Sequence, residues 1–140
     1  MNHVLEHVES FNLCLKKAFK ILKPGGTLLG QLPTTSCFER TFFNKFWAGF
    51  HFPRHLQIPS RLGLNTALLK AGFQTARVLG VPHVQSALSL QNVLVANKIF
   101  KVHQFGKIKI YNLLILLVLP LELIAYCFGK GGIVNFVAKK

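Results

Sequence analysis

Apolar residues recur at helical spacing near the start of the chain. Between Ser10 and Leu22 they occupy one side of a predicted helix, and lysines occupy the other side. Ser10 is placed to cap the start of this helix. Pro24-Gly25-Gly26 ends it, because proline cannot extend a helix and glycine tolerates the backbone of a tight turn. The same signals predict a second helix from Arg61 to Ala71.

Two short apolar runs alternate with these helices. Residues 27–32 read as a largely buried strand that ends at Pro33, and a second strand is predicted around residues 74–81. Residues 34–59 are rich in aromatic and histidine side chains and predict a loop with one short helix. The order helix, strand, helix, strand indicates an α/β fold in which helices cover a sheet.

The chain changes character after Pro82. Residues 86–105 form a long apolar helical pattern, and residues 111–128 hold only Asn112 and Glu122 as strongly polar members inside them. The second stretch would be about 27 Å long as a helix, close to the thickness of a bilayer core. Pro120 and Glu122 argue against a single span, which leaves a buried helix, an interfacial helix and a true span as alternatives. Residues 133–138 read as a final strand.

Composition restricts the chemistry. The 140 residues are 51% hydrophobic, and the 17 basic against 4 acidic residues give a net charge of +13. Asp is absent, which excludes an aspartyl phosphate, a triad completed by Asp and an EF-hand loop. Three widely spaced cysteines predict neither a disulfide framework nor a zinc cage, and they fit a reducing compartment.

The positive charge suggests an anionic partner, either a nucleic acid or a lipid surface, or a chain that lacks an acidic portion. Nucleic acid is the weaker expectation, because the phenylalanines mostly fall at core spacing and no RNA-binding motif is visible. The N-terminal residues carry Glu6 and Glu9 and no basic region ahead of an apolar stretch, so they do not read as a secretory signal.

The spacing His3-Val4-Leu5-Glu6-His7 matches a zinc-protease pattern, H-x-x-E-H, in which two histidines hold zinc and a glutamate acts as base. Such a site needs a third protein ligand and a helix that continues on both sides. The pattern here begins two residues from Met1, so we expect no metal site.

Several segments together resemble the second half of class I S-adenosylmethionine-dependent methyltransferases. These are His3-Val4-Leu5-Glu6-His7-Val8, Leu22-Lys23-Pro24-Gly25-Gly26 before a strand that ends at Pro33, Leu68-Leu69-Lys70-Ala71-Gly72-Phe73, and residues 134–140. Trp47 followed by Phe52-Pro53-Arg54-His55-Leu56 is similar to a segment of the ubiquinone-biosynthesis-like branch. The resemblance covers residues 1–81 well and residues 130–140 weakly.

The resemblance implies a partial Rossmann-like methyltransferase sheet, with the last three strands, their helices and a hydrophobic helical insertion. It divides the chain into an α/β core at residues 1–81, the insertion at 82–130, and a final strand with a basic tail at 131–140. The family's glycine-rich donor turn and acidic ribose ligand have no counterpart here. The chain therefore looks like a C-terminal portion, for which we expect weak or no S-adenosylmethionine binding and a missing N-terminal half.

The resemblance also assigns residues to the cofactor side of the site. Asn2 and His3 stand at a strand end, where open α/β sheets bind ligands, so they would lie beside the cofactor. Glu6 and His7 would act as supporting hydrogen-bond partners or simply brace the strand end.

On the acceptor side, His55, with Arg54 and less surely His51, would face the substrate. His55 would remove a proton and Arg54 would hold an anionic group, unless His55 packs against Trp47 and braces the loop. Residues Pro33, Thr34 and Thr35 would line the same pocket.

The implied function is methyl transfer from S-adenosylmethionine to a small or lipid-like acceptor in the complete enzyme, with this chain alone inactive. The alternative is a non-catalytic, basic, membrane-associated protein held by residues 86–128. The corresponding location is the cytoplasm, or the inner face of a membrane to which the protein attaches peripherally.

Overall fold

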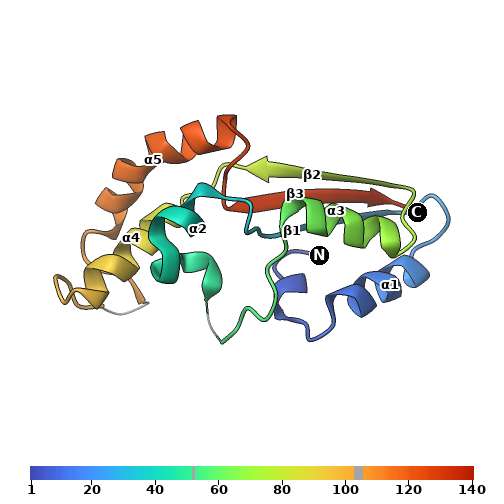
Figure 1. The fold of residues 1–140 in the computed structure, drawn as a ribbon, viewed down its shortest axis with the longest axis horizontal. Helices are drawn as coiled ribbons and strands as arrows, with labels where there is room; N and C mark the ends of the chain where they lie inside the picture. The colour runs from blue at the N-terminus through green and yellow to red at the C-terminus, as the bar shows by residue number, and fades with distance from the viewer. Residues whose placement is uncertain (52, 103–105) are drawn as a thin grey trace.

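The computed structural model of the chain, which describes residues 1–51, 53–102 and 106–140, contains a three-stranded sheet. Strand β1 spans Thr27–Pro33, β2 spans Thr75–Val81 and β3 spans Ile133–Lys139. Their order is β1-β3-β2, and β3 runs antiparallel to both neighbours (Figure 1). The α/β expectation is confirmed, and each strand lies within two residues of its predicted bounds.

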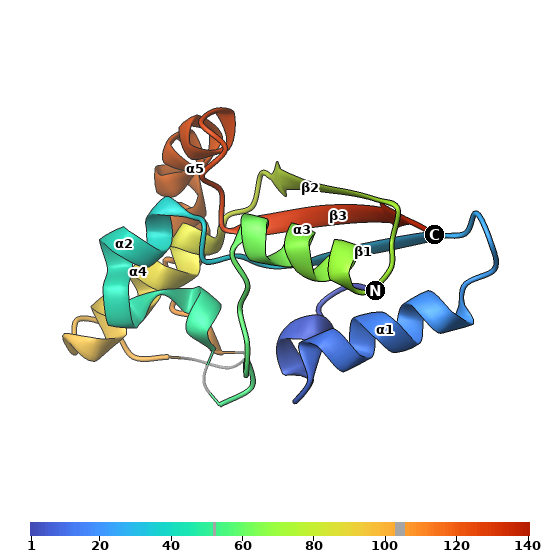
Figure 2. The same ribbon diagram turned by 45° about the vertical axis from the view of Figure 1, so that its right-hand side comes forward.

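Helices α1 (Phe11–Ile21) and α3 (Arg61–Lys70) cover one face of the sheet (Figure 2). Leu15 and Leu64 from these helices and Phe136 from β3 are buried in one core. The hydroxyl oxygen of Ser10 accepts a hydrogen bond from the Leu13 amide (3.4 Å), which confirms the predicted cap. On the opposite face of the sheet, side chains such as Leu29 and Leu79 are exposed.

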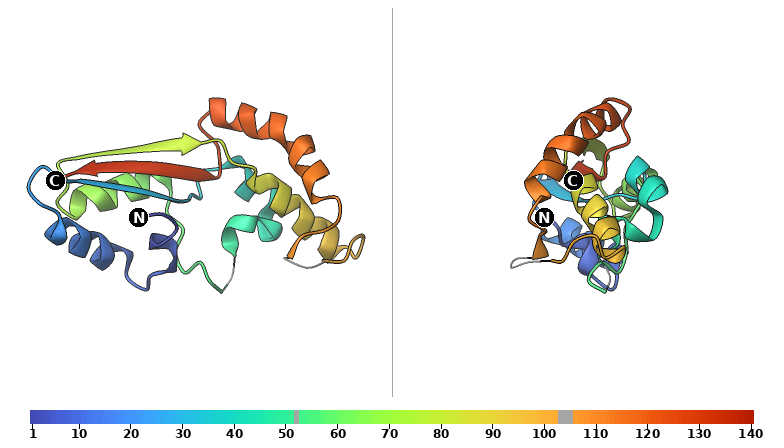
Figure 3. Two further views of the ribbon diagram at one scale, coloured as in Figure 1. Left: turned by 180° about the vertical axis from the view of Figure 1, so that it is seen from behind. Right: turned by 90° about the vertical axis from the view of Figure 1, so that its left-hand side faces the viewer.

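A helical hairpin formed by α4 (Gln85–Ala96) and α5 (Tyr111–Cys127) separates β2 from β3 in the chain and extends past the end of the sheet (Figure 3). Helix α2 (Phe38–Phe43) packs beside α4. The predicted helix over residues 86–105 was too long, since α4 ends at Ala96 and Lys98 adopts a positive φ of 60°. Residues 103–105 of that prediction lie outside the described residues.

Pro120 lies inside α5, which continues through it to Cys127, so the proline does not interrupt the helix as expected. In the part of the chain that the structure describes, no helix has both the length and the apolarity needed to cross a bilayer.

Three glutamates are buried, and two of them lie at the junction of the sheet with the hairpin. Glu39 of α2 is 0% exposed and Glu122 of α5 is 2% exposed. The Ser86 amide donates a 2.8 Å hydrogen bond to a Glu122 carboxylate oxygen. Burial, together with the neighbouring Glu122 charge, raises the pKa of Glu39 to about 7. Gly132 has no side chain, and oxygen atoms of the Glu39 and Gln85 side chains occupy the space that a Cβ would fill there.

Replacing Gly30 with alanine should destabilise the fold by about 1–3 kcal/mol. A Cβ at this position would collide with the Met1 carbonyl oxygen and the Phe136 ring, so either the N-terminal segment or the core must move. Urea unfolding followed by circular dichroism measures the change. Leu29→Ala on the exposed face is the matched control, with a loss of at most about 0.5 kcal/mol. Equal losses in both variants would contradict the packing described.

Stability should fall as pH rises from about 4.5 to about 7, because Glu39 ionises later in the folded chain than in the unfolded chain. The proton is held more tightly by the folded state, so the stabilisation is complete below the unfolded pKa and lost above the folded one. Glu39→Gln should remove this dependence and raise the stability at pH 8 by up to about 3 kcal/mol. Urea unfolding across this pH range, with Glu9→Gln as an exposed control, tests it.

Candidate functional site

The first three residues extend the sheet beside β1. Asn2 forms a parallel bridge with Gln31, and the His3 amide donates a 2.8 Å hydrogen bond to the Gln31 carbonyl oxygen. His3 then adopts a positive φ of 50°, and the chain leaves the sheet into a 3-10 turn over Leu5–His7. The extended segment beside β1 therefore ends at Asn2 and His3.

The His3 ring is engaged on both nitrogens. Nδ1 lies 3.0 Å from Glu6 Oε1, and Nε2 lies 3.2 Å from Gln31 Oε1. The amide of Gln31 is fixed in turn, because its Nε2 donates a 2.8 Å hydrogen bond to Asn135 Oδ1. His3 thus serves to join the turn to β1, and it has no free ring nitrogen to offer a ligand.

The residues present do not fit a complete site for a nucleoside-containing methyl donor. Asn2 and Gln31 line a pocket of about 270 Å³ with Gly30 and Asn135. The described residues that line this pocket include neither a glycine-rich turn nor an acidic side chain that could hold the ribose hydroxyls. Among its described lining residues, this pocket therefore supplies neither of these two donor-binding groups.

The loop that contains His55 is docked onto the N-terminal segment. The Leu56 amide donates a 2.8 Å hydrogen bond to the Glu6 carbonyl oxygen, and Gln57 Nε2 donates one of 2.6 Å to the Glu9 carbonyl oxygen. These bonds bring the His55 ring within 4.9 Å of the His7 ring, centroid to centroid. Phe52, which belongs to the segment that predicted this loop, lies outside the described residues.

Both of these histidines hold their Nδ1 proton toward the backbone. His7 Nδ1 donates to the Arg54 carbonyl oxygen (2.8 Å), and His55 Nδ1 donates to the Gly49 carbonyl oxygen (2.6 Å). A carbonyl oxygen only accepts, so each Nδ1 carries a hydrogen, and each neutral ring keeps a lone pair on Nε2. Such a nitrogen can accept a proton or bind a metal ion.

Glu6, His7 and His55 each place one ligand atom within 4.8 Å of the other two. Glu6 is buried, and its Oε2 atom has no hydrogen-bond partner among the described residues. Two imidazole nitrogens and one carboxylate oxygen suit a divalent transition-metal ion. The structure thus joins Glu6 and His7 to the distant His55, whereas the zinc-protease pattern paired His7 with His3.

The predicted pocket residues are only partly brought together. His55 and Thr35 line a pocket of about 310 Å³ whose other walls are Arg40, Phe50, Leu56 and Ile58. The pocket combines an imidazole and a guanidinium with apolar walls. Sequence reasoning missed Arg40 and Phe50, although a basic residue inside the aromatic loop was a usable signal.

The remaining predicted residues lie outside this pocket. Pro33 and Thr34 are buried, and the Thr34 hydroxyl donates a 3.1 Å hydrogen bond to the Pro59 carbonyl oxygen, so it braces the loop. Arg54 is exposed and contributes its carbonyl oxygen, at His7.

His51 is exposed and lies edge-on to the His55 ring at 5.2 Å. Partial burial, together with the nearby His55 and Arg54, lowers the His51 pKa below its usual value. Trp47 is buried two residues before Gly49, whose carbonyl oxygen holds His55, so His55 also braces the loop, through the backbone rather than through the indole.

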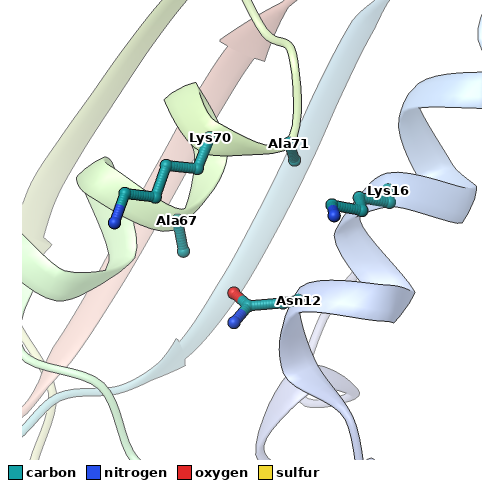
Figure 4. A pocket seen from close by; sticks show the side chains of 5 residues that line it. All are labelled: Asn12, Lys16, Ala67, Lys70 and Ala71. Carbon is teal, nitrogen blue, oxygen red and sulfur yellow. The ribbon is translucent and has the colours of Figure 1, made fainter.

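A separate pocket of about 330 Å³ lies between α1 and α3 (Figure 4). Asn12, Lys16 and Lys70 line it together with two alanines. None of the predicted site residues reaches it, and its two lysines extend from the exposed sides of their helices.

A family described as methyltransferase domain matches residues 1–78. No curated protein sequence matches the chain.

One similar solved structure is a SAM-dependent methyltransferase from Thermotoga maritima, described as a possible histamine N-methyltransferase. The match covers 100% of this chain and 54% of that protein's chain, with a TM-score of 0.59 and 18% sequence identity. An Archaeoglobus fulgidus SAM-dependent methyltransferase matches with a TM-score of 0.54 and 14% identity over 100% of this chain and 57% of its own.

A third similar structure is phosphoethanolamine N-methyltransferase 2 from Haemonchus contortus, solved with phosphomonomethylethanolamine and S-adenosylhomocysteine. The match covers 99% of this chain and 32% of that protein's chain, with a TM-score of 0.51 and 15% sequence identity. The chain therefore spans between about a third and somewhat more than half of the length of these structures, and it shares their fold. With more than half of its residues matched by the family, the chain belongs to the methyltransferase-domain family.

Proposed function

We propose that this chain forms the acceptor side of an S-adenosylmethionine-dependent methyltransferase that modifies a small or lipid-like acceptor. The pocket at His55 carries this proposal, since it places a proton-accepting nitrogen beside a cation and apolar walls. S-adenosylmethionine supplies the electrophilic methyl group when it is bound. His55 Nε2 takes the proton from the acceptor's nucleophilic atom, and the Gly49 carbonyl oxygen keeps the ring in the tautomer that can do so.

The lining of the pocket favours an acceptor with an apolar body and an anionic or hydroxyl group. Arg40 can pair with an anionic oxygen, while Phe50 and Ile58 offer apolar contact. A phenolic acceptor meets both requirements, and this supports placing the chain in the ubiquinone-biosynthesis-like branch. His51, with its lowered pKa, stays neutral near pH 7 and so does not repel the imidazolium that forms on His55.

A non-catalytic role as a basic membrane-associated protein is the second candidate. The exposed leucines of α5 favour it, and it is compatible with the same fold. Donor and acceptor binding separate the two roles, because a purely structural protein has no need of the His55 pocket.

We expect the 140-residue chain to bind S-adenosylmethionine weakly or not at all, because the pocket beside Asn2 lacks both a glycine-rich turn and an acidic side chain for the ribose. Isothermal titration calorimetry measures this. Micromolar affinity would contradict it.

The gene provides an independent check. An in-frame upstream segment that encodes a strand and a glycine-rich turn should precede Met1. A stop codon in its place would overturn the proposal of a longer enzyme for this gene.

In the complete enzyme, His55→Gln should lower kcat by about 10²- to 10⁴-fold, the usual contribution of a general base. His51→Gln is the matched control, because His51 lies in the same loop but outside the pocket, and it should leave kcat within about a factor of ten. Equal losses in the two variants would show that the loop, and not the His55 nitrogen, is what matters.

Histidine nitrogen NMR tests the tautomer in the chain alone. His55 should show a protonated Nδ1 and a bare Nε2 at pH 8, and Glu6→Gln should leave this unchanged. Addition of Zn²⁺ supplies the decisive contrast. If Zn²⁺ binds with micromolar affinity and shifts the Nε2 signals of His7 and His55 together, then Nε2 is a metal ligand and the base assignment fails.

A further inference from the structure

The outward side of α5 is apolar and largely exposed, and near its C-terminal end Leu121 and Ile124 share a pocket with Phe38 of α2. One stripe of the helix, including Leu114 and Val118, is buried against α4. Six leucine and isoleucine side chains outside that stripe are between 46% and 67% exposed, and we call them the outer α5 face: Leu113, Leu116, Leu117, Leu121, Leu123 and Ile124. A helix that faces water normally carries polar residues at such positions.

Exposed lysines flank the outer α5 face. Lys107 and Lys109 stand just before α5, Lys130 follows it, and Lys101 lies in the same connection between α4 and α5. The Lys107 ammonium also lies 4.6 Å from the centre of the Tyr111 ring, at the start of the helix.

Acidic side chains do not offset these lysines. Glu6, Glu39 and Glu122 are buried, and Glu9, which precedes α1, is the one exposed acidic side chain of the sequence. Glu122 is the only acid between residues 85 and 130. The surface of the hairpin is therefore both apolar and positive.

This combination decides between classes of partner. A nucleic acid complements the lysines but not six exposed leucine and isoleucine side chains. An anionic bilayer complements both, because leucines enter the acyl boundary while flanking lysines reach the headgroups. The hairpin extends beyond the sheet, so a flat surface can approach α5 without meeting the sheet (Figures 1 and 3).

We propose that the outer α5 face docks on an anionic membrane surface, with the helix lying in the plane of the interface. Helix α5 has 17 residues, and a helix of that length is about 26 Å long. It presents leucines on the outward side along most of this length, which suits shallow insertion parallel to the bilayer. The attachment uses none of the residues of the His55 pocket, so it stands independently of methyl transfer.

Vesicle flotation of the full chain tests the docking. The chain should float with vesicles of phosphatidylcholine mixed with phosphatidylglycerol, and bind phosphatidylcholine alone about tenfold or more weakly. Leu116→Ser/Leu117→Ser/Ile124→Ser should lower binding to the anionic vesicles by about tenfold or more. Ile21→Ser/Leu62→Ser/Leu79→Ser, exposed residues of other elements, is the matched control and should bind like the wild type.

A charge series uses the same vesicles. Lys107→Gln/Lys109→Gln/Lys130→Gln should weaken binding more than Lys16→Gln/Lys20→Gln/Lys23→Gln, which removes the same charge from the other end of the molecule. Circular dichroism confirms that all variants are folded. Equal losses in the two lysine variants would indicate adsorption by net charge and would overturn the docking surface.

Cysteine labelling reports insertion directly. Cys127 is exposed in α5, whereas Cys14 lies in α1. A polarity-sensitive fluorophore on Cys127 in Cys14→Ser should shift to the blue with anionic vesicles, and the same fluorophore on Cys14 in Cys127→Ser should not. Absence of the Cys127 shift would overturn the proposal. A second result would also overturn it: the wild type self-associates, the α5 serine variant does not, and neither binds vesicles. The outer α5 face would then bind a second copy of the chain.

Discussion

The pairing of β3 with both β1 and β2 is the constraint on which the rest of the structure depends. Strands β1 and β2 do not pair with each other, and within the three-stranded sheet each is hydrogen-bonded only to β3. The side chains of Val134, Phe136 and Ala138 point from β3 into the core under α1 and α3. The residue just before β3 also holds the segment that leads from β1 to the site, because the Thr34 amide donates a 2.9 Å hydrogen bond to the Gly132 carbonyl oxygen.

The candidate site is held together by hydrogen bonds to backbone carbonyl oxygens, and most of these bonds join segments far apart in sequence. Carbonyl oxygens of the loop orient His7 and His55, and carbonyl oxygens of the N-terminal segment hold that loop in place. Such a frame tolerates changes of side chain in the loop as long as its path is kept. It also explains why Arg54 contributes through its main chain while its guanidinium is left in solvent.

Much of the fold could be predicted from the sequence, because periodicity, caps and glycine turns are local signals. The bounds of α3 and α5 differ from the predicted ones by one residue each. The end of α4 was missed since apolar residues continue past Ala96, and only the positive φ at Lys98 shows that the helix has stopped.

The site was less accessible to the same reasoning. His55 and Thr35 line one pocket, but the proximity of His7 to His55 depends on how the loop folds back on Glu6. No local pattern encodes that return. The burial of Glu39 was also invisible, because a glutamate near the start of a short helix ordinarily faces water.

The middle strand of the sheet is the last of the three to be made. During synthesis β1 and β2 leave the ribosome before β3, the strand that joins them, and the leucine-rich hairpin also emerges before β3 does. The edges of β1 and β2 that face β3 therefore stay unpaired until residues 133–139 are made, and the apolar face of α5 is exposed during the same interval. Because of this order of emergence, we expect chaperones to bind the nascent chain, or the surface on which α5 docks to bind it before the sheet is complete.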